Sequence, residues 1–168
     1  MPSKFIHCRG AATLLLLGML CNAVFAQEDW KESPTPEPPV YSRERLIEVE
    51  MPGSALKFGI DPSSLSIGED GVLRYVMLAY SASGSTNALF EGLRCETRQV
   101  KTYARSTTPS QWTLATDPQW RTLSRNSAST RHAAALAQQG VCDMGQLSAK
   151  TVPELIRQLQ RPPQGPGN

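Results

Sequence analysis

Between residues 56 and 105, apolar and polar positions alternate in short runs that are separated by turn residues. A period of two indicates strands, because successive side chains of a strand point to opposite faces. The longest run, 72–81, is apolar on both faces, which predicts a central strand covered from both sides. The pattern as a whole predicts strands over 56–60, 65–67, 72–81, 87–95 and 98–105.

After residue 126 the apolar positions follow a helical period. The alanine-rich run 127–139 ends at Gly140, a residue suited to a left-handed C-cap, which predicts a helix. Thr151 and Glu154 form a capping-box pattern with Pro153 in the first turn, so a second helix is predicted to begin there. Strands followed by helices indicate an α+β fold: an antiparallel sheet of about five to seven strands with two helices packed on one face.

The first 26 residues have the three parts of a secretory signal peptide. Lys4 and Arg9 precede an apolar stretch centred on 14–17, and residues 24–26 (Val-Phe-Ala) fit the small-x-small cleavage pattern. We therefore expect cleavage after residue 26 and export, to the periplasm if the source is a bacterium. The alternative is a membrane anchor, but the apolar stretch is short for a span and no positive cluster follows it. No transmembrane span is expected after cleavage.

The remainder of the chain divides by composition into three parts. Residues 27–45 are rich in proline and acidic side chains, which favours an extended linker that cannot enter a sheet. Residues 46–161 carry the predicted strands and helices and are expected to form a single α+β domain. Residues 162–168 are rich in proline and glycine, which is typical of a disordered tail.

Cleavage would change the charge balance of the chain. The full sequence has 17 Lys+Arg and 15 Asp+Glu, and removal of Lys4 and Arg9 leaves 15 of each sign. The charges that remain are unevenly distributed, with net −6 over 27–70 and net +6 over 71–168. A neutral mature chain is not expected to bind nucleic acid.

Two of the four cysteines, Cys8 and Cys21, would leave with the signal peptide. Cys95 and Cys142 remain, and in an oxidising compartment two cysteines allow only one pairing. The bond would join the end of a strand to the chain that follows the first helix. The alternative is a pair of free buried thiols. A metal site is disfavoured, because the mature chain has one histidine and no C-x-x-C spacing.

Candidate catalytic groups are few. His132 is the only histidine of the mature chain, so a hydrolase or thiol enzyme would have to use it as the general base. A packed histidine on the alanine-rich helix is the alternative interpretation. The chain has no G-x-S-x-G turn, no glycine-rich phosphate loop and no nucleotide fingerprint, so no catalytic residue is assigned and no cofactor is expected.

The basic half of the chain offers a candidate binding face. By a period of two, Lys101, Tyr103 and Arg105 fall on one side of the strand predicted over 98–105. A basic face with an aromatic side chain can hold an anionic glycan, a lipid headgroup or a phosphate. The alternatives are a solvated strand face and a face covered by the acidic N-terminal segment of the same molecule.

Several stretches of the chain form a recognisable set of motifs. They are FGIDPSSLSIG (58–68), DGVLRY (70–75), NALFEGLRC (87–95), KTYA (101–104), the spaced Trp112 and Trp120, and RHAAAL (131–136). Together they resemble the cryptic neisserial protein-like family of exported bacterial proteins. This resemblance implies export and brings no established catalytic residues. The chain departs from the family in two places: Cys21 lacks the small residue before it that lipidation needs, and residues 138–141 lack a common aromatic. A lipid-anchored form is therefore not expected.

These patterns favour an exported cell-envelope protein with a non-catalytic binding or assembly role. Its partner would be an envelope protein or an anionic envelope ligand. One alternative is anion binding through the basic strand face, and the other is an enzyme that uses His132.

Overall fold

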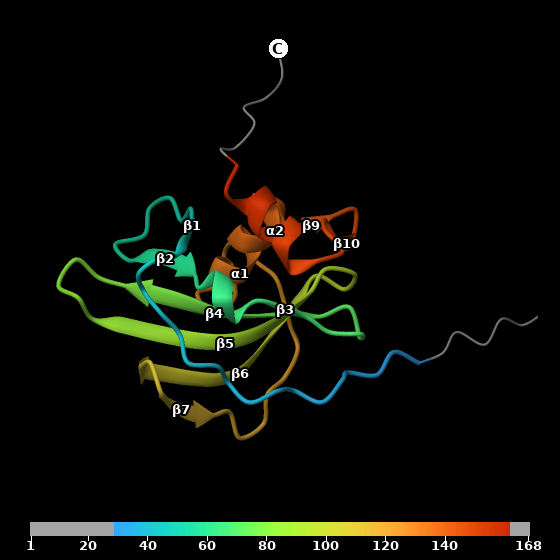
Figure 1. The fold of residues 1–168 in the computed structure, drawn as a ribbon, viewed down its shortest axis with the longest axis horizontal. Coiled ribbons are helices and arrows are strands. Elements are labelled where there is room, and N and C mark those ends of the chain that lie inside the picture. The colour runs from blue at the N-terminus through green and yellow to red at the C-terminus, as the bar shows by residue number, and fades with distance from the viewer. Residues whose placement is uncertain (1–28, 162–168) are drawn as a thin grey trace, which may run out of the picture.

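The computed structural model describes residues 29–161, so the predicted signal peptide over 1–26 and the predicted tail over 162–168 lie outside the described residues. The main sheet is antiparallel and follows the order β1-β2-β4-β5-β6-β7, while β3 pairs with β4 and β8 pairs with β6 (Figure 1). Its strands are β1 (Ile47–Val49), β2 (Lys57–Ile60), β3 (Ser66–Ile67), β4 (Leu73–Tyr80), β5 (Thr86–Arg94), β6 (Gln99–Thr108), β7 (Gln111–Leu114) and β8 (Arg121–Thr122).

The helices follow the sheet in the chain. Helix α1 (Arg131–Leu136) continues into a π-helical turn (Ala137–Val141), and α2 (Val152–Leu159) comes last. A small hairpin of β9 (Cys142–Asp143) and β10 (Gln146–Leu147) lies between them in the chain. The first helix begins later than predicted, because residues 127–130 form a turn, and Gly140 with φ of +117° ends it in the left-handed conformation.

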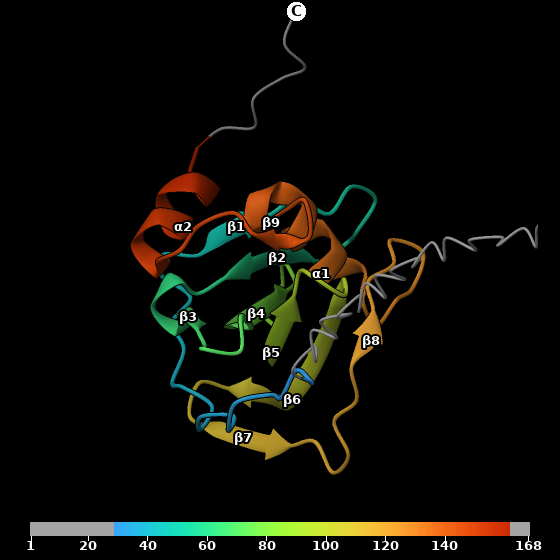
Figure 2. The same ribbon diagram turned by 90° about the vertical axis from the view of Figure 1, so that its right-hand side faces the viewer.

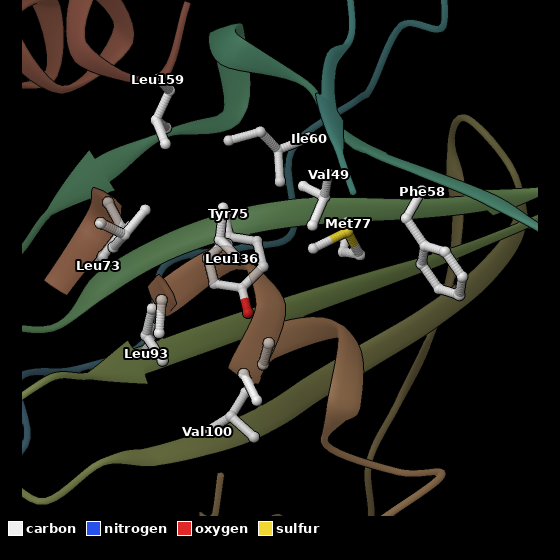
Figure 3. Packing of buried hydrophobic residues seen from close by; sticks show 14 of the residues in the cluster. Val49, Phe58, Ile60, Leu73, Tyr75, Met77, Leu93, Val100, Leu136 and Leu159 are labelled. Atoms are coloured by element: carbon white, nitrogen blue, oxygen red, sulfur yellow. The ribbon is translucent and has the colours of Figure 1, made fainter. Parts of the chain in front are cut away.

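The α+β prediction is confirmed, although the main sheet has eight strands rather than about five to seven. Both helices pack on one face of the sheet, which we call the helix face. Figure 3 shows part of the core there, which includes Tyr75 and Met77 of β4 and Leu136 of α1, all three fully buried. No helix within residues 29–161 is long and apolar enough to cross a membrane.

The disulfide prediction is also confirmed. Cys95, which follows β5, is bonded to Cys142 at the start of β9, with their Cα atoms 5.5 Å apart. The bond ties the central sheet to the chain that leaves α1. The alternative of two free thiols does not apply to this structure.

The N-terminal segment, expected to be an extended linker, packs on the sheet. Residues 29–42, which we call the strap, have no regular secondary structure yet lie across the sheet on the side away from the helices (Figures 1 and 2). Tyr41 of the strap is only 4% exposed and belongs to a second core with Val76, Phe90 and Tyr103. Proline keeps the strap out of the hydrogen-bonded sheet, as expected, but does not keep it from packing on a sheet face.

Candidate functional site

Strand β5 directs its side chains to two different environments. Its F-E-G-L-R stretch places Phe90 in the core under the strap and Glu91 on the helix face. Gly92 is on the strap side, where a Cβ atom would collide with the hydroxyl of Tyr103 and with Val72. This alternation explains why the F-E-G-L-R stretch mixes an aromatic, a carboxylate and a glycine.

On the helix face, Glu91 is the centre of a buried hydrogen-bond network. One carboxylate oxygen accepts from Tyr75 at 3.0 Å and lies 2.9 Å from Nε2 of His132, and the other accepts from Thr102 at 2.9 Å. Tyr75, Glu91 and Thr102 are direct neighbours on β4, β5 and β6. Phe58 stacks on the imidazole, with ring centroids 6.2 Å apart.

This network is sealed from solvent. The side chain of Glu91 is 0% exposed and that of His132 is 6% exposed. Burial, together with the adjacent Glu91, raises the pKa of Tyr75 well above its ordinary value, so its hydroxyl stays protonated and donates. Cys95 and Cys142 are bonded to each other and supply no thiolate. The arrangement is that of a structural histidine, and the geometry gives no support to His132 as a reactive base.

The predicted grouping of Lys101, Tyr103 and Arg105 on one face is corrected by the structure. Phe90 pairs with Ala104 while Glu91 pairs with Thr102, so Tyr103 is an extra residue in a β-bulge. A bulge shifts the alternation by one residue. Lys101 and Tyr103 therefore face the strap together, whereas Arg105 is exposed and pairs with Leu89, which packs against the helix-face core.

Two other arginines take the place of Arg105 on the strap side. Arg74 of β4 lies opposite Gly92, which in turn lies opposite Lys101, and its guanidinium is 5.9 Å from the ring centre of Tyr103. The guanidinium of Arg94 lies 3.8 Å from the ring centre of Trp30 in the strap. We call the surface formed by these side chains the strap site: Arg74, Arg94, Lys101, Tyr103, Trp112 and Trp120.

The strap site holds a carboxylate of the same molecule. Glu32 lies 2.8 Å from Nζ of Lys101, and it accepts hydrogen bonds from the Tyr103 hydroxyl at 2.8 Å and from the Trp120 indole at 3.1 Å. Burial alone would raise the pKa of Glu32, but these hydrogen bonds and the charge of Lys101 outweigh it and lower that pKa. Burial and the bond to Glu32 raise the pKa of Tyr103.

Asp70 and Arg74 hold the strap backbone. Their side chains are almost fully buried and form an ion pair of 2.8 Å. The same carboxylate accepts from the backbone N–H of Ser33 at 2.9 Å, and the guanidinium donates to the carbonyl of Ser33 at 3.2 Å. Both backbone groups of one strap residue are thus paired with a charged side chain of the sheet domain.

Aromatic contacts extend the site in both directions along the strap. The indole of Trp30 donates to the carbonyl of Asp70 at 2.9 Å and its ring meets Trp120 edge-on. The indole of Trp112 donates to the carbonyl of Pro39 at 3.0 Å. The acidic strap therefore covers the basic face, which is one of the alternatives that the sequence left open.

The chain matches the model of one known protein family. The model of the CNP1-like family matches residues 25–160, which includes the strap, the sheet and both helices. The chain belongs to the CNP1-like family. The resemblance noted from the sequence motifs is thereby confirmed. No match was found among curated proteins or among solved structures.

Within this CNP1-like chain, sequence reasoning missed the Glu91 network and most of the strap site. The available signal for the network was Glu91, a carboxylate within the otherwise apolar stretch 88–93, and the signal for the strap site was Trp30, an aromatic within a proline-rich acidic segment. Neither signal identifies a partner, because Glu91 and His132 are 41 residues apart and Trp30 and Asp70 are 40 residues apart.

Proposed function

We propose that this CNP1-like protein is an exported cell-envelope protein, located in the periplasm, with a non-catalytic binding or assembly role. The strap site is its ligand-contacting surface. The predicted leader and the formed disulfide support export, since disulfides persist in oxidising compartments.

The observation that carries the binding role is the carboxylate of Glu32, held by Lys101 and Tyr103 of β6 and by Trp120, which directly precedes β8. Charge-assisted hydrogen bonds that converge on one carboxylate are the means by which proteins recognise anions. An enzymatic role finds less support, because the one histidine of residues 29–161 lies in a sealed network.

A second candidate is binding of an anionic glycan or lipid headgroup at Lys101. The same carboxylate favours it, because any accessible anion could replace Glu32 at these donors. Asp70 counts against a polyanion, since its carboxylate lies beside Arg74 and would repel a second negative group.

Export predicts a defined mature protein. In a periplasmic extract of expressing cells, we expect intact mass spectrometry to show a chain that begins at Gln27 and carries no alkylatable thiol before reduction. Cytoplasmic chains should retain residues 1–26. A full-length chain restricted to the cytoplasm, or two alkylatable thiols in the extract, would contradict export with a disulfide.

Anion binding at the strap site is tested with Glu32→Gln. In low salt we expect this variant to bind fluorescein-labelled heparin or phosphatidylglycerol vesicles more tightly than wild type, by roughly tenfold, because three donors lose their internal carboxylate. Added salt should weaken the binding. Lys101→Met, added to Glu32→Gln, should abolish the gain in affinity. The matched control is Arg105→Met, which lies on the same strand but on the opposite face and should leave the gain in place. Binding that ignores Lys101 would exclude this second candidate.

A further inference from the structure

We infer that the strap site recognises acidic, proline-containing extended peptide segments of a partner protein, and that the strap is an internal competitor for it. This inference rests on the proposed binding function and specifies its ligand class. The structure shows the mode of recognition directly, because the strap is itself such a segment, with the sequence DWKESPTPEPPVYS over 29–42.

The strap is bound as a ligand segment is bound, through side chains of the sheet domain rather than through strand pairing. Trp112 donates its indole N–H to the carbonyl of Pro39. Aromatic grooves that bind proline-rich peptides work on this principle, because the extended polyproline conformation leaves its carbonyls free and costs little entropy to order.

The strap site, together with the neighbouring Asp70, binds backbone peptide groups as well as a charged side chain. Asp70 accepts a backbone N–H and Arg74 donates to a backbone carbonyl, both at Ser33. Lys101, Tyr103 and Trp120 then select for a carboxylate one residue earlier, at Glu32. An acceptor and a donor that match the N–H and C=O of one residue suit a peptide, and the acceptor carboxylate would repel the sulfates of a glycan, so the observations favour a peptide ligand.

The strap does not fill the site. An open pocket of about 290 Å³ lies beside strap residues 35–38 and is also lined by Phe90, Tyr103 and Leu114. Among the described residues, the two buried side-chain polar atoms without a partner are the hydroxyl of Tyr41 in the strap and Nε of Arg74, whose guanidinium contacts Ser33. Buried polar groups are normally paired. A segment with larger side chains at the positions of residues 35–38 would fill more of this pocket.

Tethering explains how a loosely fitted segment can still occupy the site. A covalently linked segment competes at an effective concentration of order millimolar, so an outside peptide must be abundant or better matched to replace it. The hydrogen bonds that hold Ser33 and Pro39 are made by side chains of the sheet domain, so they can open without breaking a strand ladder. Local opening of such a segment costs less than global unfolding.

The test uses the full mature chain and a fluorescein-labelled peptide of residues 29–42. Fluorescence anisotropy should show weak binding to wild type and binding about 10 to 100 times tighter to Glu32→Gln, whose internal competitor lacks the carboxylate. A peptide with glutamine at the position of Glu32 should bind about tenfold more weakly. In the Glu32→Gln background, Trp112→Phe keeps an aromatic ring but removes the donor to Pro39, so it should weaken peptide binding. Arg105→Met in the same background should leave peptide binding unchanged.

Hydrogen exchange on wild type provides a readout that needs no variant. The amide protons of Ser33 and Ser42, bonded to Asp70 and Asp61, should exchange faster than that of Val76 in the sheet, which is bonded to Ser64. Equal protection of all three would overturn internal competition, because the strap would open only with the whole fold.

The remaining outcomes separate this inference from the proposed function. If Glu32→Gln binds heparin or vesicles through Lys101 but not the peptide, the peptide inference fails and the binding role stands. If a folded Glu32→Gln binds neither probe, both fail. Self-association of wild type in sedimentation, lost in Trp112→Phe, would assign the site to a second copy of this chain and overturn the inference of a separate partner.

Discussion

Replacing Glu91 with alanine is expected to lower the free energy of unfolding by about 3 to 5 kcal/mol. The change removes the shared acceptor of Tyr75, Thr102 and His132, and buried polar groups that lose their partner carry the full cost of desolvation. The loss would be measured by urea denaturation followed by circular dichroism. Glu48→Ala is the matched control, because Glu48 is also a strand glutamate but has an exposed side chain, and its effect should stay within about 0.5 kcal/mol.

His132→Ala tests the same network from the other partner. We expect a large loss of stability here too, because the substitution removes one of the three hydrogen-bond partners of the buried Glu91 and the ring stacked on Phe58. If His132 has a structural role, the stability of the protein depends on it and no specific reaction does. If His132→Ala folds with wild-type stability and abolishes an activity on envelope substrates, the structural assignment is wrong and the enzymatic alternative returns.

Removing the disulfide is expected to have an effect of similar size. The double substitution Cys95→Ser/Cys142→Ser should lower the free energy of unfolding by about 4 kcal/mol, because the bond closes a long loop and restricts the unfolded chain. The two cysteines are 47 residues apart in the sequence. For a domain whose net stability is of the order of 5 to 15 kcal/mol, this is a large fraction.

The disulfide prediction has an internal control. Reductant should destabilise wild type to the level of the double variant and should leave the double variant unchanged. An equal denaturation midpoint for oxidised wild type and the double variant would show that the bond contributes little to stability, whatever its role in export.

Local pattern was sufficient for much of the fold. Alternation identified β2, β4, β5 and β6 near their observed bounds, since the period of side chains along a strand is a local property. The cap at Thr151 was also local and is present, with its side chain accepting from the N–H of Glu154 at 3.4 Å. Strand β1 and the β9–β10 hairpin were missed, because elements of two or three residues are too short to establish a period.

The candidate site depended on information that local pattern does not carry. A strict period of two predicts Arg105 on the same face as Lys101. The extra residue of the bulge places Arg105 on the opposite face. Arg74 and Arg94 were visible as charges, but their place beside Tyr103 and Trp30 comes from strand register and from the return of the N-terminal segment.

The sequence by itself determined the family, the α+β class, the pairing of Cys95 with Cys142 and the separation of acidic and basic halves. These follow from motifs, periodicity, counting and composition. Only the tertiary structure decided that Glu32 forms an ion pair with Lys101 and that Glu91 links the side chains of Tyr75 and Thr102 to His132. It also decided that a proline-rich segment packs on the sheet. The physical reason is sequence separation: Glu32 and Lys101 are 69 positions apart, Glu91 and His132 are 41 apart, and Ser33 and Arg74 are 41 apart. Such contacts depend on how the sheet twists, bulges and is covered, and no window of sequence contains that information.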